Sequence, residues 1–251
     1  MKKLFSAVVS AGLVFAMGTG ISIAQDDWKV IPVEIFACSY NEGKGPEDLA
    51  AFVENFNDWA DENNLNDYAA WILTPYYFGP GANSGFDFGW LGANKTAAGQ
   101  GKGQDKWLKN GLIEEAEANW TCSAHANMAS VNYKPAKTPK DGIITMADCS
   151  YKEGATFDGL ASAMTSYAEV LSDAGSDAAI FHWYPVYGGG GEPFDFKWVE
   201  SHKTLEAMGE DYDRLATGRL FVQRNQLMAH LTSCDASRAY IAKSVRHVEL
   251  R

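Results

Sequence analysis

The six residues Cys38-Ser39-Tyr40-Asn41-Glu42-Gly43 occur a second time, with one difference, as Cys149-Ser150-Tyr151-Lys152-Glu153-Gly154. Further matches follow each copy in the same order: 74–79 with 184–188, 86–90 with 194–198, 95–96 with 203–204, and Cys122 with Cys234. Because the matching segments keep their order and nearly keep their spacing, the sequence predicts an internal duplication of one structural unit.

Each copy begins with an alternating apolar stretch that predicts a strand, at 28–38 in the first copy. A helix is expected next, opened in the first copy by Gly45-Pro46-Glu47-Asp48, which has proline near the first helical position and acids in the first turn. Apolar residues then recur at helical spacing: Leu49, Phe52, Val53, Phe56 and Ala60 in one copy, and Leu160, Ala163, Met164, Tyr167 and Leu171 in the other.

The remaining segments of the two copies also correspond. Second strands are expected at 68–78 and 178–187, third strands at 86–90 and 194–198, and last strands at 122–133 and 234–245. Helical regions are expected at 96–119 and 204–231, the second with a break at Gly218. A segment rich in proline and lysine, 134–140, predicts a linker between the copies.

Each copy therefore has the order β-α-β-β-α-β, the ferredoxin-like pattern, in which the strands lie side by side in the order 4-1-3-2. Two such units in one chain resemble the dimeric α+β-barrel superfamily, in which two sheets close face to face. The fold class predicted is α+β, with two tandem ferredoxin-like repeats packed as an intramolecular barrel. The expected boundaries are 25–133 for the first repeat, 134–141 for the linker and 142–251 for the second.

The N-terminal 1–24 has the features of a secretory signal peptide: Met1-Lys2-Lys3, an apolar run, and Ser22-Ile23-Ala24 before a cut at Gln25. The alternative is an uncleaved anchor, although the apolar run is short for a bilayer span of about 20 residues. A cleaved signal predicts a periplasmic or secreted protein with no membrane attachment. The net charge of −11 disfavours nucleic acid and anionic lipid as partners.

The four cysteines include one pair per copy. In an oxidising compartment an even number of cysteines indicates disulfides, and the duplication favours Cys38–Cys122 and Cys149–Cys234 among the three connectivities. The predicted topology supports this pairing, because it places the end of the first strand beside the start of the fourth. A thiol redox pair or a metal site is the alternative, and no Cys-x-x-Cys motif supports it.

The predicted topology gathers carboxylates and phenols at one edge of each sheet. The residues concerned are Tyr40, Glu42, Tyr77 and Asp87 in the first copy, and Tyr151, Glu153, Tyr187 and Asp195 in the second. Such a set could bind a polar ligand, a sugar or a cation, or perform acid–base chemistry. Alternatively, the carboxylates cap loop amides and the tyrosines cover the sheet edge.

Two of the five histidines are possible haem ligands. The superfamily that the chain resembles includes haem enzymes with one axial histidine, which points to His182 and His230. The alternative is that each is an ordinary, partly buried histidine.

The leading functional hypothesis is an exported protein that binds a small ligand, either at the loop edge or in the barrel. The alternatives are an oxidoreductase or another cofactor-dependent enzyme, haem enzymes included, and a structural or interaction module. The sequence specifies neither the ligand, nor a cofactor, nor the oligomeric state.

Overall fold

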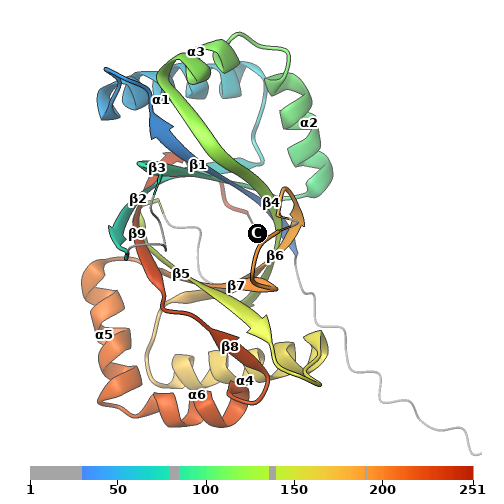
Figure 1. Cartoon of the computed structure of the whole chain (residues 1–251), viewed down its shortest axis with the longest axis vertical. Coiled ribbons are helices and arrows are strands. Elements are labelled where there is room, and N and C mark those ends of the chain that lie inside the picture. The colour runs from blue at the N-terminus through green and yellow to red at the C-terminus, as the bar shows by residue number, and fades with distance from the viewer. Residues whose placement is uncertain (1–29, 80–84, 136–139, 190, 251) are drawn as a thin grey trace, which may run out of the picture.

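A computed structural model describes 30–79, 85–135, 140–189 and 191–250 (Figure 1). The predicted signal peptide lies outside these residues. The first half contains β1 (Ile31–Tyr40), α1 (Pro46–Glu62), β2 (Tyr68–Tyr77), β3 (Phe88–Asn94), α2 (Ala97–Trp107), α3 (Leu112–Asn119) and β4 (Trp120–Lys134). The second contains β5 (Gly142–Tyr151), α4 (Phe157–Asp173), β6 (Ala179–Tyr187), β7 (Phe196–His202), α5 (Leu205–Ala216), α6 (Leu220–Met228), β8 (Thr232–Cys234) and β9 (Arg238–Arg246).

Eight of the nine strands form one closed antiparallel barrel, and the short β8 pairs with the end of β5. Within the first half the order is β4-β1-β3-β2, and within the second it is β6-β7-β5-β9, so both halves have the predicted ferredoxin-like arrangement. The barrel closes where the halves meet, because β4 pairs with β6 and β2 pairs with β9. The predicted α+β fold class is confirmed.

The helices cover the barrel on two opposite sides, with α1 to α3 over the first half's sheet and α4 to α6 over the second's (Figure 1). Apolar side chains consequently form three clusters: one inside the barrel and one between each sheet and its helices. The predicted stripes supply the outer clusters, with Leu49, Phe52 and Phe56 buried on α1 and Leu160, Met164 and Tyr167 buried on α4.

The two predicted disulfides are confirmed. Cys38 lies opposite Cys122 in the β1–β4 ladder, and Cys149 lies opposite Cys234 in the β5–β8 ladder. Each bridge therefore joins directly paired residues of neighbouring antiparallel strands, where the side chains are close.

The last strand of the second half is not the single strand 234–245 that the sequence predicts. It is divided into β8 and β9. The reason is Asp235, whose carboxylate accepts the amide of Asp148 at 2.8 Å and forms an ion pair with Arg238 at 2.6 Å. A side chain thus takes the place of a ladder carbonyl, and the strand is interrupted.

Each long helical region also forms two helices. The chain turns at Asn110, whose side-chain oxygen accepts the amide of Leu112 at 2.5 Å. It turns again at Gly218, the predicted break, where a Cβ atom would lie 2.5 Å from the carbonyl oxygen of Arg214. The predicted linker starts later than expected, since Lys134 is a buried residue of β4.

No helix in the described part of the chain is long and apolar enough to cross a membrane.

Candidate functional site

The two aspartates of the predicted edge site bind the backbone. Asp87 accepts the amide of Tyr40 at 2.9 Å, and Asp195 accepts the amide of Tyr151 at 2.8 Å. Each carboxylate therefore satisfies a donor at the end of the first strand of its half. The structure brings the tyrosine and the aspartate together in both halves, in the manner of the capping alternative.

The other edge residues are more dispersed. Tyr77 and Tyr187 are 57% and 73% exposed, and their strands pair there with the opposite half of the chain, opposite Ala239 and Asn127 respectively. Glu42 and Glu153 are also exposed. A ligand-binding role for these residues stays a prediction.

His182 lies on the outer face of β6, beneath the helices of the second half. It is completely buried, and its ring contacts Tyr133, Phe196 and Trp198. This burial lowers its pKa to about 3, so the imidazole is neutral. His230 is exposed in the turn after α6.

A cavity of about 470 Å³ lies between the second half's sheet and its helices. We call it the outer cavity. Three alternate residues of β7, Trp198, Glu200 and His202, lie on the face of the sheet that forms its floor. Helix residues, among them Tyr167 and Met208, form the opposite wall.

A charged cluster around the buried His202 joins the floor of the outer cavity to α5. The two ring nitrogens of His202 lie 3.2 Å from Asp211 and 3.6 Å from Glu200. Burial alone would lower the pKa of His202, but the two carboxylates outweigh it and raise the pKa to about 9. His202 is therefore an imidazolium held between two carboxylates. Arg214 adds a second cation to Asp211 at 2.8 Å.

One guanidinium in the wall of the outer cavity has no ion-pair partner among the described residues. Arg224, on α6, is half-buried and lines the cavity. Burial and Glu200 raise the pKa of Tyr167, while Arg224 opposes this shift, which places the phenol in the field of both charges. Lys152 also lines the cavity, but its ammonium donates to the carbonyl of Ala229 at 2.6 Å. Glu200 and Asp211 are thus paired with cations, whereas Arg224 and Lys152 have no acidic partner among the described residues, and of these two only Arg224 lacks a hydrogen-bond acceptor there.

Side chains occupy the corresponding space in the first half. The buried carboxylate of Glu34 accepts hydrogen bonds from Tyr68 and Gln104, both at 2.9 Å. Trp90, which corresponds to Trp198, donates to the hydroxyl of Tyr68 at 2.9 Å. These contacts join the sheet to α2.

The sequence predictions missed the outer cavity and its charged cluster. A usable signal was present, because Glu200 and His202 alternate on one strand and therefore share a face. Asp211 and Arg214 stand three residues apart on a helix, a spacing that favours an ion pair. Among the described residues, no cluster of three histidine, cysteine or acidic side chains is arranged to hold a metal ion.

No protein-family model and no curated protein sequence matches the chain. Solved structures do match. Chlorite dismutase from Candidatus Nitrospira defluvii, in complex with imidazole, has a TM-score of 0.52 and 8% identity over 87% of this chain and 93% of its own. A novel heme-binding protein from Thermus thermophilus has a TM-score of 0.50 and 10% identity over 85% of this chain and 91% of its own. At such identities the similarity shows the fold alone, an α+β barrel.

Proposed function

We propose that the protein binds a small organic anion in the outer cavity of its second half. The observation that carries the proposal is the guanidinium of Arg224, which lies in the wall of a 470 Å³ cavity and has no ion-pair partner in the described part of the chain. Cavities of about 300–1,000 Å³ suit small-molecule ligands. A guanidinium favours a carboxylate or phosphate, because its planar fork of N–H groups matches two oxygen atoms.

The rest of the cavity wall favours an anion with a flat apolar body. Tyr167 and Trp198 present aromatic rings, packed edge to face at 5.9 Å. Leu171 and Met228 add buried aliphatic surface. A small aromatic carboxylate combines the two properties: its ring contacts the aromatic wall and its carboxylate pairs with Arg224.

In this proposal the protein binds its ligand after export, in the compartment that the signal-like N-terminus predicts. Two disulfides support this placement, because such bridges persist in oxidising compartments.

One fold neighbour is named as heme-binding, which raises the question of haem in this chain. His202 and His182 do not suit axial ligation, and a role for His230 stays a prediction. His202 is the histidine of the outer cavity, and both of its nitrogens face carboxylates as a protonated imidazolium. A protonated nitrogen has no lone pair for iron. His182 does not line the outer cavity, and aromatic rings enclose it.

Titration calorimetry with benzoate and indole-3-acetate tests the proposal. The wild-type protein should bind at least one of them, and Arg224→Gln should weaken binding by roughly tenfold or more, since a charge-assisted hydrogen bond contributes about 1.5–3 kcal/mol. Lys102→Gln is the matched control, because it removes one positive charge from an exposed position on α2 and should leave the affinity unchanged. Equal affinity in the wild type and Arg224→Gln would refute the proposal.

A further inference from the structure

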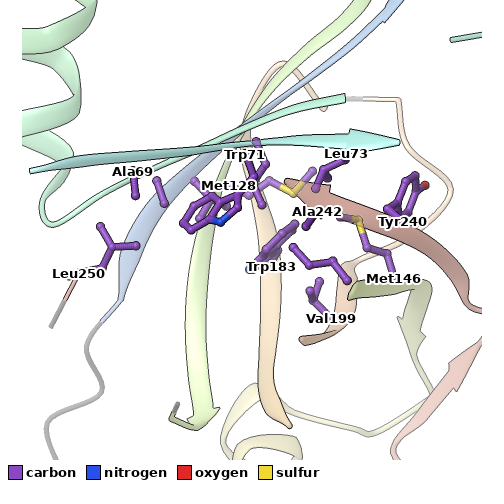
Figure 2. Close-up of a cluster of buried hydrophobic side chains, with 14 residues drawn as sticks. Ala69, Trp71, Leu73, Met128, Met146, Trp183, Val199, Tyr240, Ala242 and Leu250 are labelled. Atoms are coloured by element: carbon purple, nitrogen blue, oxygen red, sulfur yellow. The ribbon is translucent and has the colours of Figure 1, made fainter. Parts of the chain in front are cut away.

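The interior of the barrel is filled at one end and hollow at the other. Side chains of Leu73, Met128, Met146 and Tyr240 belong to the buried cluster in the barrel, which Figure 2 shows converging from different strands. A second cavity, of about 490 Å³, lies where β1, β5 and β6 begin and β3, β4 and β7 end. We call it the barrel cavity.

The wall of the barrel cavity is mainly apolar and aromatic. Trp71, Phe181 and Trp183 supply rings, and Leu91, Ile144 and Val199 supply aliphatic surface. The C-terminal segment after β9 contributes Leu250, which is 7% exposed and packs against the same cluster. Flat aromatic walls favour a ligand that presents ring faces or edges to them.

The cations at the rim of the barrel cavity are already engaged. The ammonium of Lys134 donates to the carbonyls of Ser176 and Ala178, both at 2.8 Å. Lys203 forms an ion pair with Asp177. This separates the two cavities chemically: the outer cavity has a guanidinium without an ion-pair partner among the described residues, whereas the ammonium groups of Lys134 and Lys203 at the barrel cavity are held by carbonyls and by a carboxylate.

Apart from the ring nitrogens of His202, which face carboxylates, two buried polar atoms of the lining residues have no hydrogen-bond partner among the described residues: the indole nitrogen of Trp183 and the side-chain oxygen of Asn132. A buried donor or acceptor left unpaired costs about 1–3 kcal/mol. A ligand with a single hydroxyl or carbonyl group would have a donor or an acceptor available in this wall after a small side-chain rotation.

We infer that the barrel cavity is a second binding site, for a neutral, flat, ring-containing molecule with at most one or two polar groups. It is distinct from the anion site, because the two cavities lie on opposite faces of the second half's sheet and have only His202 in common among their lining residues. Binding in the barrel requires that apolar surface leave water, which is favourable at roughly 25 cal/mol per Å².

Fluorescence titration with N-phenyl-1-naphthylamine, a neutral probe that brightens in apolar surroundings, tests the inference. The wild-type protein should bind the probe. Ala93→Leu and Ala242→Leu fill the cavity from two different strands, and each should weaken binding by tenfold or more. Arg224→Gln should leave probe binding unchanged, so failure of the anion site and failure of the barrel site are distinguished.

Two results would overturn the inference: no binding by the wild type, or undiminished binding by a folded cavity-filling variant. Circular dichroism and the urea midpoint show whether each variant folds. If neither variant folds, a crystal of the wild type soaked in 6-bromo-2-naphthol decides the question by anomalous scattering. Bromine inside the barrel supports the inference, and bromine elsewhere or none at all refutes it.

Discussion

The two halves of the chain share one arrangement of strands and helices but use the space between sheet and helices differently. In the β1–β3 ladder of the first half, Glu34 lies opposite Gly92. In the matching β5–β7 ladder of the second half, Thr145 lies opposite Glu200. The carboxylate therefore stands on β1 in the first half and on β7 in the second half. In the first half it lies in a closed network with Tyr68, and in the second it belongs to the floor of the outer cavity.

In the proposed account, the first half fills the space between sheet and helices with hydrogen-bonded side chains, and the second half leaves a cavity there. Gly92 is required in the first half because a Cβ atom there would lie 2.3 Å from the hydroxyl of Tyr68 and 2.7 Å from the carboxylate of Glu34. Asn94 and His202 occupy matching positions at the ends of β3 and β7. Only the histidine can become a cation that neutralises the floor.

The largest expected effect concerns a feature that the two halves share. The two disulfides span 84 and 85 residues, so the chain-entropy model assigns each roughly 4–5 kcal/mol of stability. Replacing either pair of cysteines by serine should lower the free energy of unfolding by a similar amount. Urea unfolding measures it. A much larger loss in one half would show that the two disulfides are not equivalent.

A glycine-to-alanine change tests whether side chains fill the space between sheet and helices in the first half. Gly92→Ala should cost about 2–3 kcal/mol, because the new methyl group displaces buried hydrogen-bonded side chains. Gly101→Ala, on α2, is the matched control. Its Cβ meets no atom within 4 Å, and alanine stabilises a helix interior by up to about 1 kcal/mol relative to glycine. Equal urea midpoints for the two variants would contradict the filled first half.

The pH dependence of stability tests whether His202 in the second half is an imidazolium. The pKa of His202 is about 9 in the folded protein and 6.5 in the unfolded chain, so its stabilisation is complete below pH 6.5 and is lost as the pH rises through 9. The stability difference between wild type and His202→Gln should therefore shrink by up to about 3 kcal/mol between pH 6.5 and 9. Urea midpoints across this range measure the change, and a constant difference would refute the imidazolium assignment.

The pKa of His182, in the same sheet, shifts in the opposite direction to that of His202. Its pKa falls from 6.5 to about 3 on folding, so its stabilising contribution is present above pH 6.5 and is lost as the pH falls toward 3. His182→Phe should remove this acid sensitivity while leaving the alkaline transition of His202 intact. Urea midpoints between pH 3 and 6.5 measure the effect, and an unchanged acid sensitivity in the variant would contradict it.

Much of the fold could be predicted from the sequence, because the same local signals occur in both halves. The repeated Cys-Ser-Tyr motif, the helical stripe of Leu49 and Phe52, and the pairing of Cys38 with Cys122 are each readable along the chain and agree with one another. The outer cavity was harder to predict from the sequence. Whether Glu200 reaches a helix or a cavity depends on how closely α5 approaches the sheet, which side-chain packing across the two layers determines.

The edge residues illustrate the same limit. Asp87 and Asp195 were correctly placed beside Tyr40 and Tyr151, but the sequence could not show that their carboxylates accept backbone amides. Similarly, the strand break at Asp235 depends on its contact with Asp148, which is distant in sequence.

The most direct measurement is a crystal structure of the protein soaked with 4-bromobenzoate, in which anomalous scattering locates the bromine. We expect bromine in the outer cavity of the second half, with the carboxylate against Arg224, and no signal between α2 and the first half's sheet. Bromine in the first half, or an outer cavity that excludes the ligand, would contradict it.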